Sequence, residues 1–128
     1  MRARSVLSMT VGAVVLAAAS LSIAQAQGLP TEIGQCVTTK IKSAGDRFAD
    51  DPASGSAIAY ENGGSQVSHE VLPAVAESRV GDQVRLCLVS RPRNCPANDL
   101  RGSVWRARNL RTQQGWELPD SAQKCGGA

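Results

Sequence analysis

The clearest structural signal in the sequence is the stretch Gln83-Val-Arg-Leu-Cys-Leu-Val-Ser90. Its even-numbered positions 84, 86 and 88 are apolar, whereas its odd-numbered positions include Arg85 and Cys87. This two-residue period is typical of a strand that buries one face. Gly81 before the stretch and Pro92 after it break regular structure. We therefore predict a half-buried strand over residues 83–90.

Five further segments show shorter versions of the same alternation. Asn62-Gly63 separates two of them and is the strongest short signal for a hairpin, because both residues tolerate positive φ. A second hairpin is expected about a turn near residues 112–115. Residues 44–55 are predicted to form a loop with a turn at Asp51-Pro52, and residues 71–80 a connector or a short helical turn. The further strands are expected at residues 35–42, 56–61, 65–70, 103–110 and 116–118.

Short strands between Gly and Pro turns, with no convincing helical period, predict an all-β fold. A small five- or six-stranded barrel or sandwich, SH3-like or OB-like, fits the length. A closed barrel also removes exposed strand edges.

The first 26 residues predict a cleaved secretory signal peptide. Arg2 and Arg4 provide a positive start, residues 11–19 are an uncharged apolar run, and Ala24-Gln25-Ala26 fits the small-x-small cleavage rule. A membrane anchor is the alternative, but an anchor needs about 20 apolar residues. We therefore expect residues 27–128 to form one small domain with no membrane span, in the periplasm or secreted.

Cleavage changes the charge balance. Loss of Arg2 and Arg4 lowers the net charge from +3 to +1, which gives no general argument for binding nucleic acid or an anionic membrane. Residues 27–90 carry a net charge of −3, however, and residues 91–128 carry +4. Such asymmetry marks a binding face, or a solvated surface whose arginines pair with the acidic half.

Four cysteines, Cys36, Cys87, Cys95 and Cys125, follow the cleavage site and predict two disulfides. The expected hairpin brings Cys95 within reach of Cys125, which favours the pairs Cys36–Cys87 and Cys95–Cys125. The competing pattern is Cys36–Cys125 with a local Cys87–Cys95 loop. Zinc sites need closer Cys or His spacing than the C-x7-C found here, and we expect no metal and no cofactor.

Four segments of the second half carry a resemblance. They are Gly81 to Pro96, Asn109 to Thr112, Trp116 to Ser121 and Cys125-Gly-Gly-Ala128. Together they resemble small exported proteins of proteobacteria that carry no assigned function. The resemblance implies a Gram-negative envelope location and adds no activity, ligand or catalytic residue.

Residues suited to catalysis are few. His69 is the one histidine, and its neighbour Glu70 points to the opposite face of a strand. There is no G-x-S-x-G nucleophile motif. Asp46, Asp50 and Asp51 share an acidic segment but lack the EF-hand spacing. We therefore predict that the protein is not an enzyme, with a small envelope hydrolase using His69 or the acidic segment as the alternative.

The arginines between residues 91 and 111 are the best candidates for a binding site. Asp99 is the one acid among them, and alternation places Arg106 and Arg108 on one exposed face with Trp105 in the core. Arginines bind phosphates and carboxylates well. Nucleic acid is not expected, because the whole chain has only four aromatic residues for base stacking. The expected partner is an acidic protein or envelope polymer, a structural or stress-protective role being the other alternative. The predicted binding residues are Arg91, Arg93, Arg106, Arg108 and Arg111.

Overall fold

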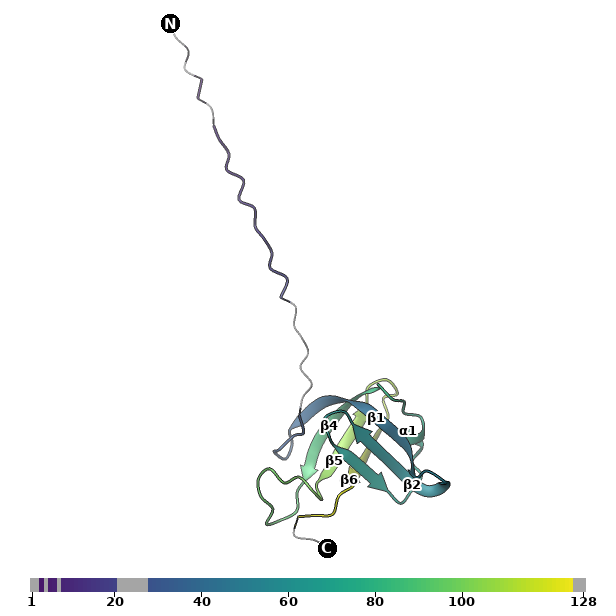
Figure 1. The fold of residues 1–128 in the computed structure, drawn as a ribbon. Helices are drawn as coiled ribbons and strands as arrows, with labels where there is room; N and C mark the ends of the chain where they lie inside the picture. The colour runs from purple at the N-terminus through teal and green to yellow at the C-terminus, as the bar shows by residue number, and fades with distance from the viewer. Residues whose placement is uncertain (1–2, 4, 7, 21–27, 126–128) are drawn as a thin grey trace.

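The structure is a computed structural model that describes residues 3, 5–6, 8–20 and 28–125. Residues 28–125 form an all-β domain with one short helix (Figure 1). The elements are β1 (Cys36–Phe48), β2 (Asp51–Tyr60), β3 (Ser65–Ser68), α1 (Pro73–Ala76), β4 (Gln83–Ser90), β5 (Val104–Asn109) and β6 (Gly115–Pro119).

All six strands belong to one antiparallel sheet with the order β3-β2-β1-β4-β5-β6. β1 is shared between the two halves of this sheet. Its first part, from Cys36 to Lys40, pairs with β4, and its second part, from Ile41 to Phe48, pairs with β2. A register shift between Ile41 and Ser43 lies at this junction, and such irregularities bend a strand and increase its twist. The bend allows one strand to serve two sheet halves that face different directions.

The predicted loop at residues 44–55 is wrong. β1 continues to Phe48 and β2 already begins at Asp51, so the two strands form a long hairpin that extends from the domain (Figure 1). Gly55 shows how the polar sequence fits into a sheet. Its φ is +126°, and a Cβ atom there would collide with the carbonyl oxygen of Ser68 on β3. Glycine at this position therefore allows two strands to approach each other closely and does not mark a loop.

The sheet curves until its edge strands β3 and β6 approach each other, but it is not closed into a barrel. One bridge, between Gln66 and Asp120, joins these edges, and the backbone nitrogen of Ser121 donates to the carbonyl oxygen of Ser65 over 3.1 Å. Both predicted alternatives therefore need correction. The strands form one sheet and not a sandwich, and a full ladder between β3 and β6 is missing.

The concave side of the sheet holds one hydrophobic core. Val84, Leu86 and Leu88 of β4 are buried, as their alternation predicts, and Trp105 is 1% exposed. α1 covers part of this core through Val75. The other buried apolar side chains are Val37, Ile41, Ile58, Tyr60, Ala107, Trp116 and Leu118.

Gln66 is a polar residue at the centre of this apolar side. Its side-chain nitrogen donates to the carbonyl oxygens of Trp105 and Leu118 over 2.8 and 2.9 Å. Its side-chain oxygen accepts from the hydroxyl of Tyr60 over 2.6 Å and from the indole nitrogen of Trp116 over 3.0 Å. Burial raises the pKa of Tyr60, which keeps its hydroxyl a donor. Gln66 thus ties β3 to β5 and β6 where backbone pairing stops.

The four cysteines form the disulfides Cys36–Cys87 and Cys95–Cys125, which is the pairing that the sequence favours. Cys36 and Cys87 lie opposite each other in the ladder between β1 and β4, with Cα atoms 4.0 Å apart. Cys95–Cys125 ties the loop between β4 and β5 to the C-terminal segment.

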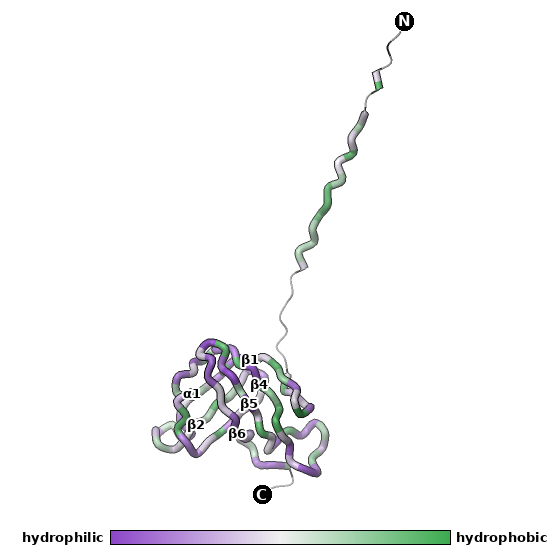
Figure 2. The backbone as a smooth tube through the Cα atoms, turned by 180° about the vertical axis from the view of Figure 1, so that it is seen from behind, coloured by the Kyte–Doolittle hydropathy of each residue, from purple (hydrophilic) through white to green (hydrophobic). Residues whose placement is uncertain are grey.

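Residues 8–20 have no regular secondary structure and their side chains are exposed; Figure 2 shows the predominantly apolar character of this segment. The predicted cleavage site at Ala24-Gln25-Ala26 lies outside the described residues. In the described part of the chain, no helix has the length and apolar content needed to cross a membrane.

Candidate functional site

The outer face of strands β1, β4, β5 and β6 carries a group of cations that we call the cationic face: Lys40, Arg85, Arg106 and Arg108. All four residues are exposed, because alternation turns them away from the core. Glu117 is the one acidic residue among the outward positions of the paired parts of these four strands.

Strand register decides which of these groups are neighbours. Arg85 lies directly opposite Arg108 in the β4–β5 ladder. Arg106 lies opposite Cys87 on one side and Glu117 on the other. The side chains of Arg106 and Glu117 form an ion pair of 2.9 Å, and Arg108 donates to the side-chain oxygen of Gln113 over 2.8 Å. Arg85 and Lys40 form no ion pair with any described residue.

The opposed pair Arg85–Arg108 is unusual. Like charges directly opposite in an antiparallel ladder destabilise the sheet. A neighbouring acid normally removes this repulsion, and Glu117 is instead engaged by Arg106. The fold therefore places two arginines opposite each other in the ladder, and neither forms an ion pair with a described carboxylate.

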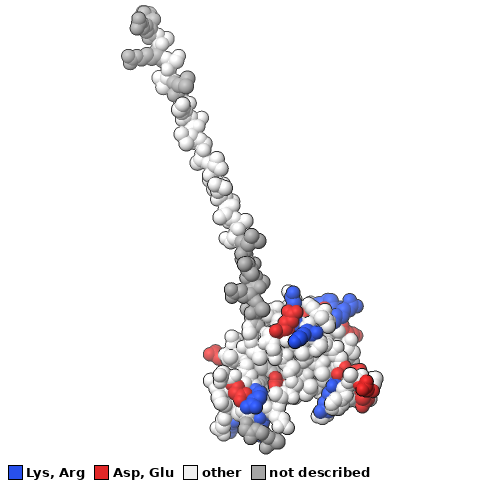
Figure 3. All heavy atoms as spheres, viewed as in Figure 1, with Lys and Arg blue, Asp and Glu red and all other residues white. Residues whose placement is uncertain are grey.

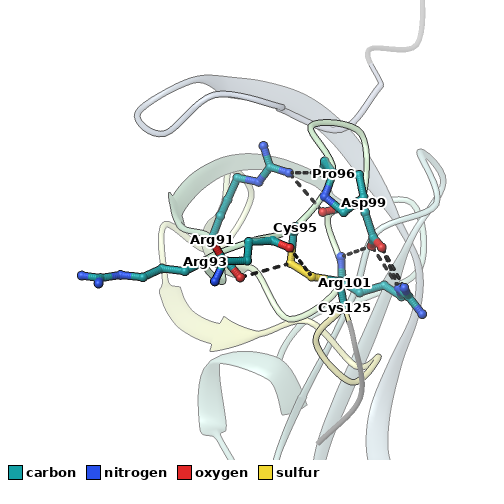
Figure 4. The surroundings of a disulfide bond; sticks show 8 residues. Arg91, Arg93, Cys95, Pro96, Asp99, Arg101 and Cys125 are labelled. Atoms are coloured by element: carbon teal, nitrogen blue, oxygen red, sulfur yellow. Dashed lines mark hydrogen bonds and ion pairs between the residues drawn. A yellow bond between two sulfur atoms is a disulfide. The ribbon is translucent and has the colours of Figure 1, made fainter.

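Arg91 has a structural role. Its guanidinium donates to the carbonyl oxygens of Pro96 and Asp99 over 3.0 and 3.1 Å and to that of Thr31 over 3.3 Å. Figure 4 shows this side chain turned into the loop that follows β4, whereas Arg93 extends away from it. Arg91 thus fixes the loop, and Arg93 is exposed to solvent.

Arg111 is also engaged within the domain. It donates to the carboxylate of Asp82 over 2.7 and 3.0 Å and to the carbonyl oxygen of Glu77 over 2.8 Å. The Asp82 carboxylate also accepts from the side-chain nitrogen of Asn109 over 2.9 Å. The hydrogen bonds from Arg111, and then from Asn109, hold the pKa of Asp82 well below its ordinary value. This ion pair fastens the turn before β4 to the turn after β5.

The structure thus divides the predicted binding set. It brings Arg106 and Arg108 together, uses Arg91 and Arg111 within the fold, and leaves Arg93 on a separate loop. Arg85 belongs to the cationic face but was missed by the prediction, which considered only the arginines after residue 90. Its outward position in the alternating strand 83–90 was the available signal.

Charges of opposite sign lie near one another on the surface. Figure 3 shows red and blue side chains next to each other in several groups on the side drawn. Asp99 and Arg101, both in the second half of the sequence, form an ion pair of 2.7 Å, and the hydrogen bond from Arg101 lowers the pKa of Asp99. Of the three ion pairs formed among the described residues, only Arg111–Asp82 joins the basic second half of the sequence to the acidic first half, so most of the charge asymmetry stays unpaired on the surface.

An open groove of about 620 Å³ lies between the β2–β3 turn, the loop before β5 and the C-terminal segment. Leu29, Pro96 and Leu100 contribute apolar surface, and Asp120 contributes a carboxylate whose pKa is raised by burial. The charged groups of the groove are engaged locally, since Asp99 binds Arg101 and Asp120 accepts from the backbone nitrogen of Ala122. The groove has room for a small ligand, but the groups that line it indicate no particular ligand class.

The residues suggested for the alternative hydrolase lie on the β1–β2 hairpin, which carries Asp46, Asp50 and Asp51, and directly after β3, where His69 follows Ser68. Nδ1 of His69 lies 2.9 Å from a guanidinium nitrogen of Arg47, which can only donate. Arg47 also stacks on the exposed ring of Phe48, 4.8 Å from its centroid. Among the described residues, no three His, Cys, Asp or Glu side chains gather in a way that suits a metal ion.

Comparison with protein-family models, curated proteins and solved structures finds no match to this chain.

Proposed function

We propose that the protein is a small exported binding domain whose cationic face contacts an acidic partner. The observation that carries the proposal is the opposed pair Arg85–Arg108, which has no carboxylate to balance it. An anionic group of a partner placed between the two guanidinium groups replaces their repulsion with charge-assisted hydrogen bonds.

The site of action in this proposal is the periplasm or the extracellular space. Support comes from the signal-peptide pattern of residues 1–26 and from two disulfides, which persist in oxidising compartments.

Of the two fold relationships considered, the OB-like one has better support. The order β3-β2-β1-β4-β5 and a helix between β3 and β4 fit a five-stranded, partly open barrel, to which β6 is added at the edge.

The partner class is an acidic protein or an acidic envelope polymer. Guanidinium groups bind carboxylates and phosphates in a two-pronged geometry. Nucleic acid is disfavoured because Tyr60, Trp105 and Trp116 are all buried, which leaves the cationic face without a ring on which a base stacks.

The proposal is tested by titrating the protein with polyglutamate and with polyphosphate at increasing salt. Affinity should fall as salt rises, and the double variant Arg85→Gln/Arg108→Gln should lose about tenfold in affinity at low salt. Arg93→Gln is the matched control, because it removes an exposed arginine outside the cationic face. Affinity that ignores salt, or an equal loss in the control, contradicts the proposal.

A further inference from the structure

The disulfide Cys36–Cys87 lies on the cationic face. Cys87 is opposite Arg106 in the β4–β5 ladder, and Arg85 projects from the same side of β4 two residues earlier. Both cysteines are only partly buried. The bond that joins β1 to β4 is therefore within reach of solutes and is flanked by two arginines.

The two sulfur atoms have different surroundings. Cys87 lies within the sheet between β1 and β5, next to the arginines. Cys36 begins β1, and the pairing of β1 with β2 starts only at Ile41, so β2 does not cover the strand edge at Cys36. Neighbouring guanidinium groups stabilise a thiolate. Cys87 is thus the better leaving group, and Cys36 lies at a strand edge that β2 leaves unpaired.

We infer that Cys36–Cys87 is a thiol–disulfide exchange site that reacts preferentially with small anionic thiols. The arginines raise the local concentration of an anionic thiolate and stabilise the thiolate that departs. This inference concerns covalent chemistry at the face and does not depend on the proposed binding of an acidic partner.

The reaction consumes two thiols. A thiolate attacks Sγ of Cys36, the Cys36–Cys87 bond breaks, and Cys87 leaves as a thiolate beside Arg85 and Arg106. A second thiolate attacks the incoming sulfur of the mixed disulfide and releases Cys36. Two thiol molecules are oxidised to their disulfide, the protein disulfide is reduced, and the two thiol protons pass to the two cysteines.

Cys95–Cys125 is an internal control for the same protein. It also is partly buried, but the guanidinium of Arg91 is turned to backbone carbonyl groups and that of Arg93 points away (Figure 4). Lys124 is the cation adjacent to it in the chain. A preference for anionic thiols should therefore be smaller at this bond.

The experiment compares glutathione, an anionic thiol, with cysteamine, a cationic one, at equal thiolate concentration and low salt. Alkylation and peptide mass mapping follow both disulfides of the oxidised protein in one sample. We expect the glutathione-to-cysteamine rate ratio to be about fivefold higher at Cys36–Cys87 than at Cys95–Cys125, and the difference to vanish at high salt.

Variants of the cationic face test whether positive charge raises the glutathione-to-cysteamine rate ratio. Arg85→Gln should lower the ratio at Cys36–Cys87 about threefold, whereas Glu117→Gln, which frees Arg106 from its ion pair, should raise it. Arg93→Gln should leave it unchanged, and circular dichroism checks that each variant is folded. Equal ratios at the two disulfides, or a ratio that does not respond to Arg85→Gln and Glu117→Gln, overturn the inference.

Discussion

Gln66 on the inner side of the sheet and Arg85 on its outer side are both long polar residues on strands, but their surroundings are opposite. Gln66 is fully buried, and both ends of its amide are used by four groups from three other strands. Arg85 is exposed, faces another arginine and has no ion pair among the described residues. The difference indicates that the buried amide serves stability, whereas Arg85 is left without an ion pair, as the proposed binding of an acidic partner requires.

The largest expected loss of stability comes from removing the hydrogen bonds that Gln66 makes with Tyr60, Trp116 and the carbonyl groups of Trp105 and Leu118, which we call the inner network. Gln66→Leu leaves two carbonyl oxygens, the Trp116 indole and the Tyr60 hydroxyl with fewer partners in the core, and should lower the free energy of unfolding by about 3 kcal/mol. Urea denaturation measures the loss. Gln83→Leu, on the exposed side of β4, is the control and should change stability by less than about 0.5 kcal/mol. Similar losses in both variants contradict the assigned role of Gln66.

The second effect concerns Asp82 and pH. Because its pKa is lowered in the folded protein from an ordinary value of 3.8, the charged carboxylate stabilises the fold above that value. This stabilisation is lost as the pH falls below 3.8. Asp82→Asn should lower the urea midpoint at neutral pH, less than Gln66→Leu does, and should weaken the acid dependence. A variant as acid-sensitive as the parent protein excludes Asp82 as the source.

A smaller loss of stability tests whether Tyr60 and Gln66 act together in the inner network. Tyr60→Phe removes only the hydroxyl that donates to Gln66 and should cost about 1 kcal/mol. In the background of Gln66→Leu the same change should cost less, since the shared hydrogen bond is already absent. Full additivity in this double-mutant cycle indicates that the two side chains do not act together.

The smallest expected effect is a gain in stability, not a loss. Arg85→Gln removes one of the two like charges that lie opposite each other in the β4–β5 ladder and should stabilise the protein by about 0.3 kcal/mol at low salt. The gain should disappear at high salt, where the repulsion is screened. A loss of stability in thermal denaturation shows instead that Arg85 supports the fold.

The strands with strict alternation were predictable, and those with polar or bent segments were not. The sequence locates β4 to the residue and the β2–β3 turn at Asn62-Gly63, where Gly63 has a φ of +93°. It does not indicate that β1 continues to Phe48, because pairing with β2 stabilises that segment. It also does not place Gln66 in the core, since local pattern favours Val67, the apolar neighbour on the opposite face.

The cationic face was likewise predictable from the sequence only in part. Outward positions for Arg85, Arg106 and Arg108 follow from period-two alternation, but only the register shows that Arg85 faces Arg108 and that Arg106 is paired with Glu117. Likewise, no local signal separates Arg91 and Arg111, which bind groups of the same domain, from arginines left in solvent.

By itself, the sequence determined the all-β class, the most regular strand and the inward or outward direction of its side chains, because these depend on residues close together in the chain. The tertiary structure alone decided the open single sheet, the burial of Gln66 and the grouping of the cationic face. Those features depend on pairing between strands distant in sequence, where register and sheet curvature select each residue's neighbours.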